Sequence, residues 1–171
     1  VTNDKKIRNT VETLRDPIAN SDLAKFSKRT PCLLDSIQIA FLRAKMPFSK
    51  EWREKRRQIA KFYTEELEKT SIETPSENKN ARHSYFRYVI RSENRDKLKR
   101  FLFKNGVFTG LECYELHLAK PFQDLGHKKG DFPVTERCNE MILYLPIHPF
   151  LKDEEIVKIT RLINLFDKKH G

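Results

Sequence analysis

The apolar residues in the second half of the chain switch repeatedly between the period of a strand and that of a helix, and this feature restricts the fold most. β-Forming residues dominate 83–91, helical spacing returns over 94–105 before Gly106, and 107–112 is strand-like again. The alternation continues with a helix over 132–141, a strand over 142–147 and a helix that begins at Lys152. We therefore predict an α+β fold, in which a small sheet of about three strands is covered by helices and preceded by long helices.

The first half of the chain is helical in pattern. Ile7, Val11 and Leu14 share one face of a helix that Asn3 or Asp4 can cap. Residues 33–46 are apolar nearly all round, so we expect a helix that is buried between layers or between subunits and is broken at Pro47. An amphipathic helix follows over 49–69. We expect one part over 1–48 and a C-terminal α+β domain over 49–171.

Composition allows a globular core and excludes several functional classes. The 171 residues are 38% hydrophobic, which is enough to bury a core. The five glycines cannot form a GxGxxG or Walker phosphate loop, and Cys32, Cys113 and Cys138 fit neither a disulfide framework nor a zinc pair. No run of about 18 apolar residues suggests a membrane span, and no apolar block follows the first lysines. We expect a cytoplasmic protein without a metal site.

A net charge of +10 and the basic run Arg53-Glu54-Lys55-Arg56-Arg57 raise the possibility of nucleic-acid binding. Acidic residues are interleaved with the basic ones, and no aromatic RNA-binding strand or helix-turn-helix spacing accompanies them. A solvated helix face is the favoured interpretation. A stand-alone regulatory or interaction module, binding nucleic acid through this basic face, stays open as the alternative function.

Several short motifs of the second half occur in an order that matches a known family. They are Leu116-His117-Leu118, residues 120–126, residues 130–136, and Leu145-Pro146-Ile147-His148-Pro149 followed by residues 153–156. In this order the chain resembles the C-terminal region of the DegT/DnrJ/StrS family of pyridoxal-phosphate-dependent sugar aminotransferases. Upstream, residues 34–40 resemble the family's Met-Asp-Glu-Ile-Gln-Ala-Ala helix, and His83-Ser84-Tyr85 resembles its strand opening.

The resemblance implies a fold-type-I aminotransferase that transfers an amino group to a keto-sugar nucleotide, with residues 1–48 as the end of its large domain and a subunit contact. In that family the lysine that binds pyridoxal 5'-phosphate lies upstream of the position that matches Val1. We therefore expect no catalytic residue, no bound cofactor and no transamination from this chain alone. The helix over 33–46 is expected to contact a large domain or a second subunit, giving a homodimer.

Four residues are candidates for substrate binding: His117, Tyr114, Tyr85 and Arg87. The family counterpart of His117 lies at the mouth of the substrate site, although a structural histidine would fit the same pattern. Tyr85 and Arg87 alternate with Arg91 on the predicted strand and so share a face, as they would on any half-exposed sheet. Glu112 and Glu115 are interpreted as solvated loop acids.

Two positions depart from the family pattern. An Asn and an Arg that reach the cofactor phosphate of the neighbouring subunit are replaced by Pro31 and Leu33. Neither replacement can donate a side-chain hydrogen bond or supply a charge to a phosphate. Phosphate binding by this segment is therefore not expected. His83 and His148, beside a strand start and a Pro-rich turn, are interpreted as structural.

Overall fold

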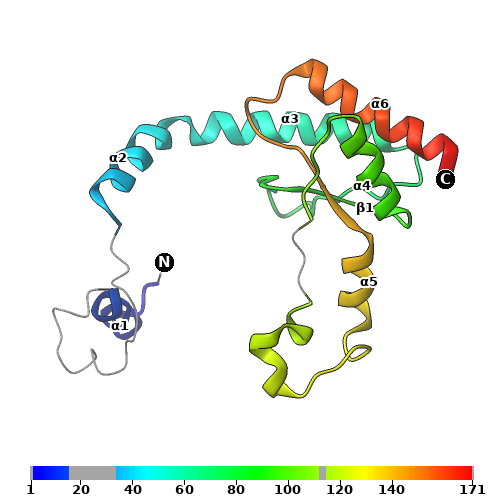
Figure 1. Cartoon of the computed structure of the whole chain (residues 1–171). Helices are drawn as coiled ribbons and strands as arrows, with labels where there is room; N and C mark the ends of the chain where they lie inside the picture. The colour runs from blue at the N-terminus through cyan, green and yellow to red at the C-terminus, as the bar shows by residue number, and fades with distance from the viewer. Residues whose placement is uncertain (1, 16–33, 112–114, 171) are drawn as a thin grey trace. The chain divides into compact units, whose positions relative to one another are not determined.

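A computed structural model describes residues 2–15, 34–111 and 115–170 (Figure 1). The chain divides into two compact units, Val1–Phe48 and Ser49–Gly171, and each is described by itself. Among the described residues, no helix is long and apolar enough to span a bilayer. Pro31, Cys32, Leu33, Glu112, Cys113 and Tyr114 lie outside the described residues.

The first unit contains α1 (Lys5–Arg15), α2 (Ser36–Lys45) and the 3₁₀ turn η2 (Met46–Phe48). Asp4 is the N-cap of α1, because its Oδ1 accepts hydrogen bonds from the backbone N–H groups of Lys6 and Ile7 at 2.8 and 3.2 Å. Asp35 caps α2 in the same way and forms a reciprocal capping box with Gln38. The helix ends just before the predicted break at Pro47.

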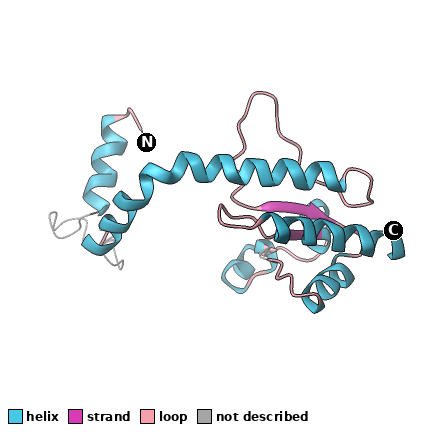
Figure 2. Ribbon diagram, turned by 90° about the horizontal axis from the view of Figure 1, so that it is seen from above, coloured by secondary structure: helices cyan, strands magenta, loops and turns pink. Residues whose placement is uncertain are grey.

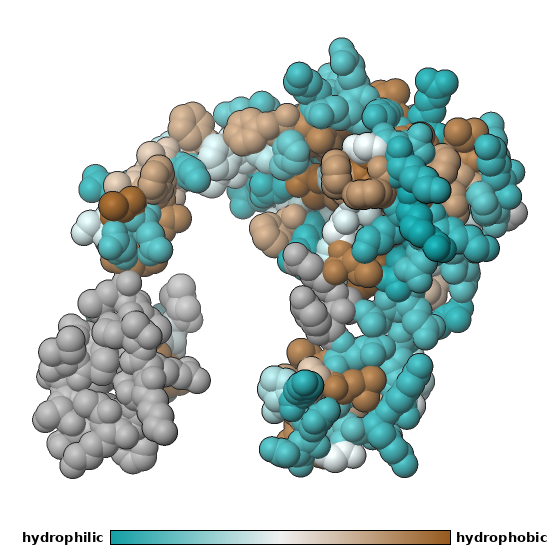
Figure 3. Space-filling view, in the orientation of Figure 1, coloured by the Kyte–Doolittle hydropathy of each residue, from teal (hydrophilic) through white to brown (hydrophobic). Residues whose placement is uncertain are grey.

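The predicted burial of the second helix does not occur within this unit. No residue of α2 is buried, and the described residues leave large apolar side chains exposed along α2 and η2. Figure 3 shows these side chains as brown atoms over α2. Ile37 is 67% exposed, Phe41 59% and Met46 68%. A helix with this composition normally has a cover, and the described residues of this unit do not supply one.

The sheet of the second unit pairs β1 (Tyr88–Arg91) with β2 (Ile142–Leu145) in antiparallel register, with Tyr88 opposite Leu145 and Arg91 opposite Ile142. The α+β fold class is confirmed. The expected third strand, 107–112, reaches β2 through a single bridge between Gly110 and Tyr144. A Cβ on Gly110 would lie 3.1 Å from Cδ2 of Tyr144, so a larger residue here would require the tyrosine ring to shift by a few tenths of an ångström.

Three helices cover the sheet: α3 (Ser49–Leu67), α4 (Arg95–Lys104) and α6 (Asp153–His170). α3 and α6 run alongside each other, and α4 packs on α6 (Figures 1 and 2). Gly106, with a φ of 76°, follows α4 as predicted, and the acidic start and basic end of α6 suit its dipole. The fully buried core side chains include Tyr63, Leu67, Tyr88, Ile90, Leu98, Leu102, Leu143 and Ile163.

Two tyrosine hydroxyls tie α3 to the sheet region. Tyr63 donates to the carbonyl of Pro146 at 2.9 Å, and the hydroxyl of Tyr88 lies 2.8 Å from that of Thr64. Burial raises the pKa of Tyr63 well above its ordinary value, so this phenol stays protonated and remains a donor. These bonds join α3 to β1 and to the residue that follows β2.

Between the sheet strands the chain forms two 3₁₀ segments, η3 (Leu116–Leu118) and η4 (Lys120–Leu125), and the helix α5 (Pro133–Met141). Pro133 occupies the first turn of α5, where its missing N–H has no cost, as the sequence predicts. α5 leads directly into β2. η3 and the start of α5 contribute the histidine and carboxylate described next.

Candidate functional site

The candidate site is a small group of residues that we call the His117 cluster: His117, Gly130, Phe132 and Glu136. Glu136 Oε1 accepts a hydrogen bond from the backbone N–H of Gly130 at 2.7 Å and lies 3.0 Å from Nε2 of His117. The side chains of His117 and Glu136 are 8% and 11% exposed. The cluster therefore joins η3, the loop before α5 and the first turns of α5.

The charge of Glu136 determines which nitrogen of the His117 ring carries a proton. The Gly130 N–H bond, aided by His117, lowers the pKa of the Glu136 carboxyl below its ordinary value. An ionised carboxylate can only accept hydrogen bonds, so Nε2 of His117 must carry the proton. The ring is thus held through Nε2.

The loop before α5 is folded around Phe132. The centroid of the Phe132 ring lies 4.9 Å from the ring of His117 and 5.1 Å from that of His127. Asp131 Oδ2 accepts from the backbone N–H of Lys128 at 3.1 Å and lies 3.5 Å from Nδ1 of His127. These contacts place the Gly130 N–H, in a left-handed segment with a φ of 97°, opposite Glu136.

Glu136 was missed by sequence reasoning, although a weak signal was present. Asp131-Phe132-Pro133 marks the start of a helix, and an acid in the following turn can reach back to loop N–H groups. Its pairing with His117, 19 residues earlier, needs the folded loop. The structure shows that the ring of His117 is held by Glu136 on its Nε2 side, and both interpretations of His117 stay open.

Tyr85 does not lie where the strand prediction placed it. β1 begins only at Tyr88, and Tyr85 has a φ of 45°, the one positive φ among the described residues other than glycine. The alternation of Tyr85 with Arg87 and Arg91 on one face is therefore wrong. Tyr85 is buried, whereas Arg87 is exposed and its guanidinium lies 5.0 Å from the centroid of the Tyr144 ring.

A clamp between α3 and residues 77–85 holds Tyr85 in this conformation. Arg57 makes a bidentate ion pair with Glu77, at 2.6 and 3.0 Å, and also donates to the carbonyl of His83 at 2.7 Å. Glu77 Oε1 accepts from the backbone N–H of His83 at 2.6 Å. His83 Nδ1 accepts from the N–H of Tyr85 at 3.0 Å, so His83 has the structural role that was expected. A strained tyrosine persists because these bonds over-determine it.

The clamp predicts a loss of stability in acid. The Arg57 bond, followed by the His83 N–H bond, lowers the pKa of Glu77 from an ordinary value of 4.5 to about 2. Because the folded pKa is depressed, the stabilisation is present above pH 4.5 and is lost as the pH falls towards 2. We expect the melting temperature, followed by circular dichroism, to fall through this window.

Glu77→Gln should make that decrease shallower, and the decrease that remains includes a contribution from Glu136. Glu65→Gln is the matched control, since its pairing with Lys61 on α3 is well exposed and screened. If the melting temperature fell equally steeply with pH in Glu77→Gln and in the unmodified chain, the Arg57–Glu77 pair would not be a source of the acid sensitivity.

The three described candidates among the four predicted residues do not form one group. His117 contacts Glu136, Tyr85 packs against His83 and Tyr88, and Arg87 lies over Tyr144, so the three described candidates have separate local environments. The carbonyl of Glu115 accepts from the N–H of Leu118 in the turn of η3. Among residues 2–15, 34–111 and 115–170, no set of three or more histidine, cysteine or acidic side chains could hold a metal ion.

The basic run on α3 is largely used within the chain. Arg57 binds Glu77, the Nε of Arg56 donates to the carbonyl of Ser84 at 3.2 Å, and Lys55 lies 3.4 Å from Glu51. Both carboxylate oxygens of Glu54 accept hydrogen bonds from Nη2 of Arg82, at 2.7 and 2.8 Å. This pairing supports the interpretation of a solvated structural helix and gives no support to nucleic-acid binding at this face.

The described residues do not fit a pyridoxal phosphate site. A lysine that forms a Schiff base must be enclosed, so that its amine is desolvated and positioned. Every described lysine is exposed except Lys99, which is half-buried on α4. The part of the chain that the structure describes therefore holds no lysine in the required environment.

Comparison with known proteins agrees with this architecture. A family model of the DegT/DnrJ/EryC1/StrS aminotransferase family matches residues 1–164. A pleiotropic regulatory protein of Geobacillus stearothermophilus is 37% identical over 126 residues, which cover 71% of this chain and 34% of the relative. The erythromycin biosynthesis sensory transduction protein EryC1 of Saccharopolyspora erythraea is 33% identical over 156 residues, or 90% of this chain and 43% of the relative.

A third relative and a solved structure extend the comparison. The dTDP-3-amino-3,6-dideoxy-alpha-D-galactopyranose transaminase of Aneurinibacillus thermoaerophilus is 24% identical over 96% of this chain and 45% of its own length. The crystal structure of S. venezuelae DesV superposes with a TM-score of 0.87 at 23% identity, over 100% of this chain and 47% of DesV, and shows the fold alone. The chain spans between about a third and a half of each of these proteins. It belongs to the DegT/DnrJ/EryC1/StrS aminotransferase family.

Proposed function

We propose that residues 1–171 are the C-terminal region of a pyridoxal-phosphate-dependent aminotransferase whose substrate is a keto-sugar nucleotide. The observation that carries this proposal is the match of the family model to residues 1–164, together with relatives of which the chain spans 34–45%. The transaminase from Aneurinibacillus thermoaerophilus, named for a dTDP-linked amino sugar, supports the substrate class. The enzyme would work in the cytoplasm.

The role of this region is to supply contacts rather than the reacting lysine. His117 is the proposed substrate contact of this region, and the Glu136 contact that fixes its imidazole supports the proposal. Residues 1–48 complete the large domain or the subunit interface. The exposed apolar side chains of α2 support this assignment, since they need a large domain or a second subunit of a homodimer as cover.

The cofactor experiment compares this chain with the intact polypeptide that carries it. After incubation with pyridoxal phosphate and borohydride, the 171-residue chain should yield no stoichiometric adduct at a single lysine by mass spectrometry. Exposed lysines should react weakly and at many positions, and no lysine among the described residues is enclosed. The intact polypeptide should yield one adduct upstream of Val1.

The two samples separate the two halves of the proposal. With an amino donor and a keto-sugar nucleotide, amino-sugar product should form with the intact polypeptide only. A stoichiometric adduct or turnover by the 171-residue chain would show that its supporting role is wrong. An intact polypeptide that binds the cofactor and aminates no keto-sugar nucleotide would show that the proposed reaction is wrong.

A further inference from the structure

A strongly basic surface lies on the outside of α4 and α6, and it shares no residue with the His117 cluster. The two helices run in opposite directions and lie side by side (Figures 1 and 2). Before α4, Nδ2 of Asn94 donates to the carbonyl of His170 at 3.2 Å. After α4, a Cβ on Gly106 would lie 3.7 Å from Nζ of Lys158. The start of α4 therefore lies beside the end of α6, and its end lies beside the first two turns of α6.

On α4, exposed cations form a row next to α6. The flank of α4 that is turned to α6 is marked by Phe101, whose ring packs on the ring of Phe166 at a centroid distance of 5.6 Å. Lys97 and Lys104 stand four residues before and three residues after Phe101, and these spacings place them on its side of the helix. Arg100 stands between Lys97 and Lys104 at the same spacings, so these cations follow one another along the helix.

The outward face of α6 continues this row. The flank of α6 that carries Asn164 is turned to α3, because Nδ2 of Asn164 donates to the carbonyl of Glu66 at 3.2 Å. Exposed side chains at three- and four-residue spacings mark the outward face: Glu154, Val157, Lys158, Arg161, Leu165 and Lys168. The cations of both helices define what we call the basic surface: Lys97, Arg100, Lys104, Lys158, Arg161, Lys168 and Lys169.

The charges of the basic surface are not neutralised within the described chain. None of these cations forms an ion pair with any described acid, in contrast to Lys55 and Lys61 of α3. Of the nearby acids, Asp96 lies with its carboxylate 2.8 Å from Nε of Arg95, and Glu154 stands in the first turn of α6. Like charges on neighbouring helices repel one another, so the basic surface favours an anionic partner.

Aliphatic side chains are interleaved with the cations on α6. Val157 is 50% exposed and Leu165 44%, and both stand on the outward face beside Lys158 and Arg161. With Leu162, these residues line a hollow of about 510 Å³. This mixture suits the interface of an anionic membrane, where lysine and arginine contact the headgroups while aliphatic side chains enter below them.

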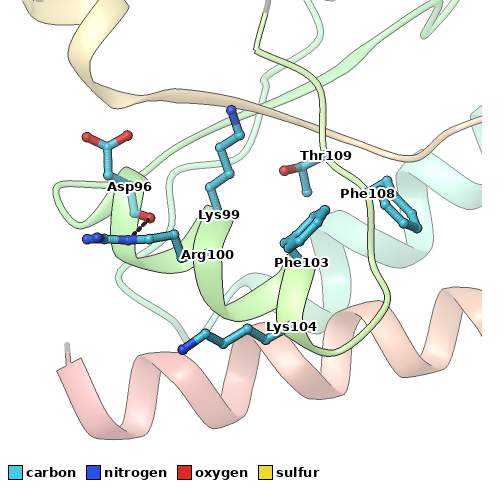
Figure 4. Close-up of a pocket in the computed structure, with 7 residues that line it drawn as sticks. All are labelled: Asp96, Lys99, Arg100, Phe103, Lys104, Phe108 and Thr109. Atoms are coloured by element: carbon cyan, nitrogen blue, oxygen red, sulfur yellow. Dashed lines mark hydrogen bonds between the residues drawn. The ribbon is translucent and has the colours of Figure 1, made fainter.

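The aromatic rings near α4 are not part of the basic surface. Figure 4 shows Phe103 and Phe108 on one side of α4 and the charged ends of Arg100 and Lys104 directed away from them. Single-stranded nucleic acids bind through stacked bases as well as phosphates, and no described ring stands among these cations to stack on. A phosphate backbone would also leave the aliphatic side chains of α6 without a partner.

We propose that the basic surface binds the headgroup layer of an anionic lipid bilayer, with α4 and α6 lying on the plane of the membrane. The cations contact lipid phosphates, and Val157 and Leu165 enter the interface. The cations are spread along both helices and are not gathered around one anchoring pocket, which favours a fluid layer of headgroups over an acidic protein with fixed anchors. Contact of this kind is peripheral and needs no membrane-spanning helix.

Co-sedimentation with lipid vesicles tests this proposal. The 171-residue chain should bind phosphatidylcholine vesicles that contain about 30% phosphatidylglycerol at least about tenfold more tightly than vesicles of phosphatidylcholine alone. Binding should weaken as the salt concentration is raised from about 0.1 to about 0.5 M, because the cations are exposed and become screened. Equal binding to the two kinds of vesicle would overturn the proposal, since exposed apolar side chains such as those of α2 would then be its cause.

Charge-matched variants assign the binding to this surface. Lys158→Gln combined with Arg161→Gln should weaken binding to the anionic vesicles at least about tenfold. Lys55→Gln combined with Lys61→Gln removes the same charge from α3, where both lysines are paired, and should weaken it less than about twofold. Melting temperatures should agree among these variants, because the side chains are exposed. Equal weakening by the two pairs would mean that net charge alone drives the binding, and would overturn the proposal.

A leucine variant tests the insertion of α6 into the interface. Leu165→Ala should weaken vesicle binding about threefold, whereas Leu125→Ala, which shortens an exposed leucine (66%) of η4, should not. Unchanged binding by Leu165→Ala would contradict this insertion.

Two further polyanions distinguish lipid from other partners. A single-stranded oligothymidylate and polyglutamate should both bind the chain more weakly than the anionic vesicles do, at an equal concentration of negative charge. Tighter binding of oligothymidylate would identify a nucleic acid as the partner, and tighter binding of polyglutamate would identify an acidic protein. Either result would overturn the lipid assignment.

Discussion

Leu102→Ala should destabilise the second unit by about 2–5 kcal/mol, the range for removing a fully buried leucine. Leu102 lies on α4 with no exposed surface, packed in the core between the helices and the sheet. The loss would combine the transfer free energy of the removed carbons with the cost of the cavity. Chemical denaturation followed by circular dichroism should show a lower midpoint with a nearly unchanged slope.

The neighbouring residue supplies the control for this prediction. Phe103 is 63% exposed, so Phe103→Ala removes a larger side chain with little loss of buried area, and the free energy of unfolding should change by less than about 1 kcal/mol. Equal effects at the two positions would mean that α4 does not pack against the sheet through Leu102.

Glu136→Ala should open the loop before α5 while leaving the main core folded. Without the carboxylate, the Gly130 N–H and the Nε2–H of His117 lose their acceptor in a place with little access to water. We expect the amide of Gly130 to exchange its hydrogen about tenfold faster or more, measured by NMR. The amides of β1 and β2 should exchange at unchanged rates, because they belong to the core.

Two variants of α5 sharpen this result. Glu136→Gln keeps an acceptor oxygen for Gly130 and loses only the charge. In this variant the Gly130 amide should exchange at a rate between those of the unmodified chain and of Glu136→Ala. Glu140→Ala removes an exposed acid from the same helix and should leave Gly130 unaffected. If Glu140→Ala accelerated exchange as strongly as Glu136→Ala, the effect would come from the charge of α5 and not from the His117 cluster.

The helices could be predicted because their signals are local. Asp4, Gly106 and Pro133 act within one turn of the helices that they start or end, and the periodic apolar residues of α3, α4 and α6 supply the core. Family membership could also be predicted, because several motifs that are weak individually occur in the same order along the chain as in the family.

The errors have long-range causes. Tyr85 was placed in a strand by its neighbours' β propensity, but Arg57, 28 positions before it, fixes the preceding residues in another conformation. The expected third strand is present only as the bridge between Gly110 and Tyr144, 34 residues apart in the chain. The partner of His117 lies 19 residues further along. No local pattern contains these contacts, because each exists only after distant segments have come together.

The exposed apolar residues of α2 have a consequence during synthesis. Residues 1–48 leave the ribosome before any part of the second unit, so Ile37, Phe41 and Met46 are in water while the second unit is still being made. Whatever covers α2 must either be made earlier or be recruited by the nascent chain. A cell that makes this segment without its cover would present α2 to chaperones as an unfinished fold.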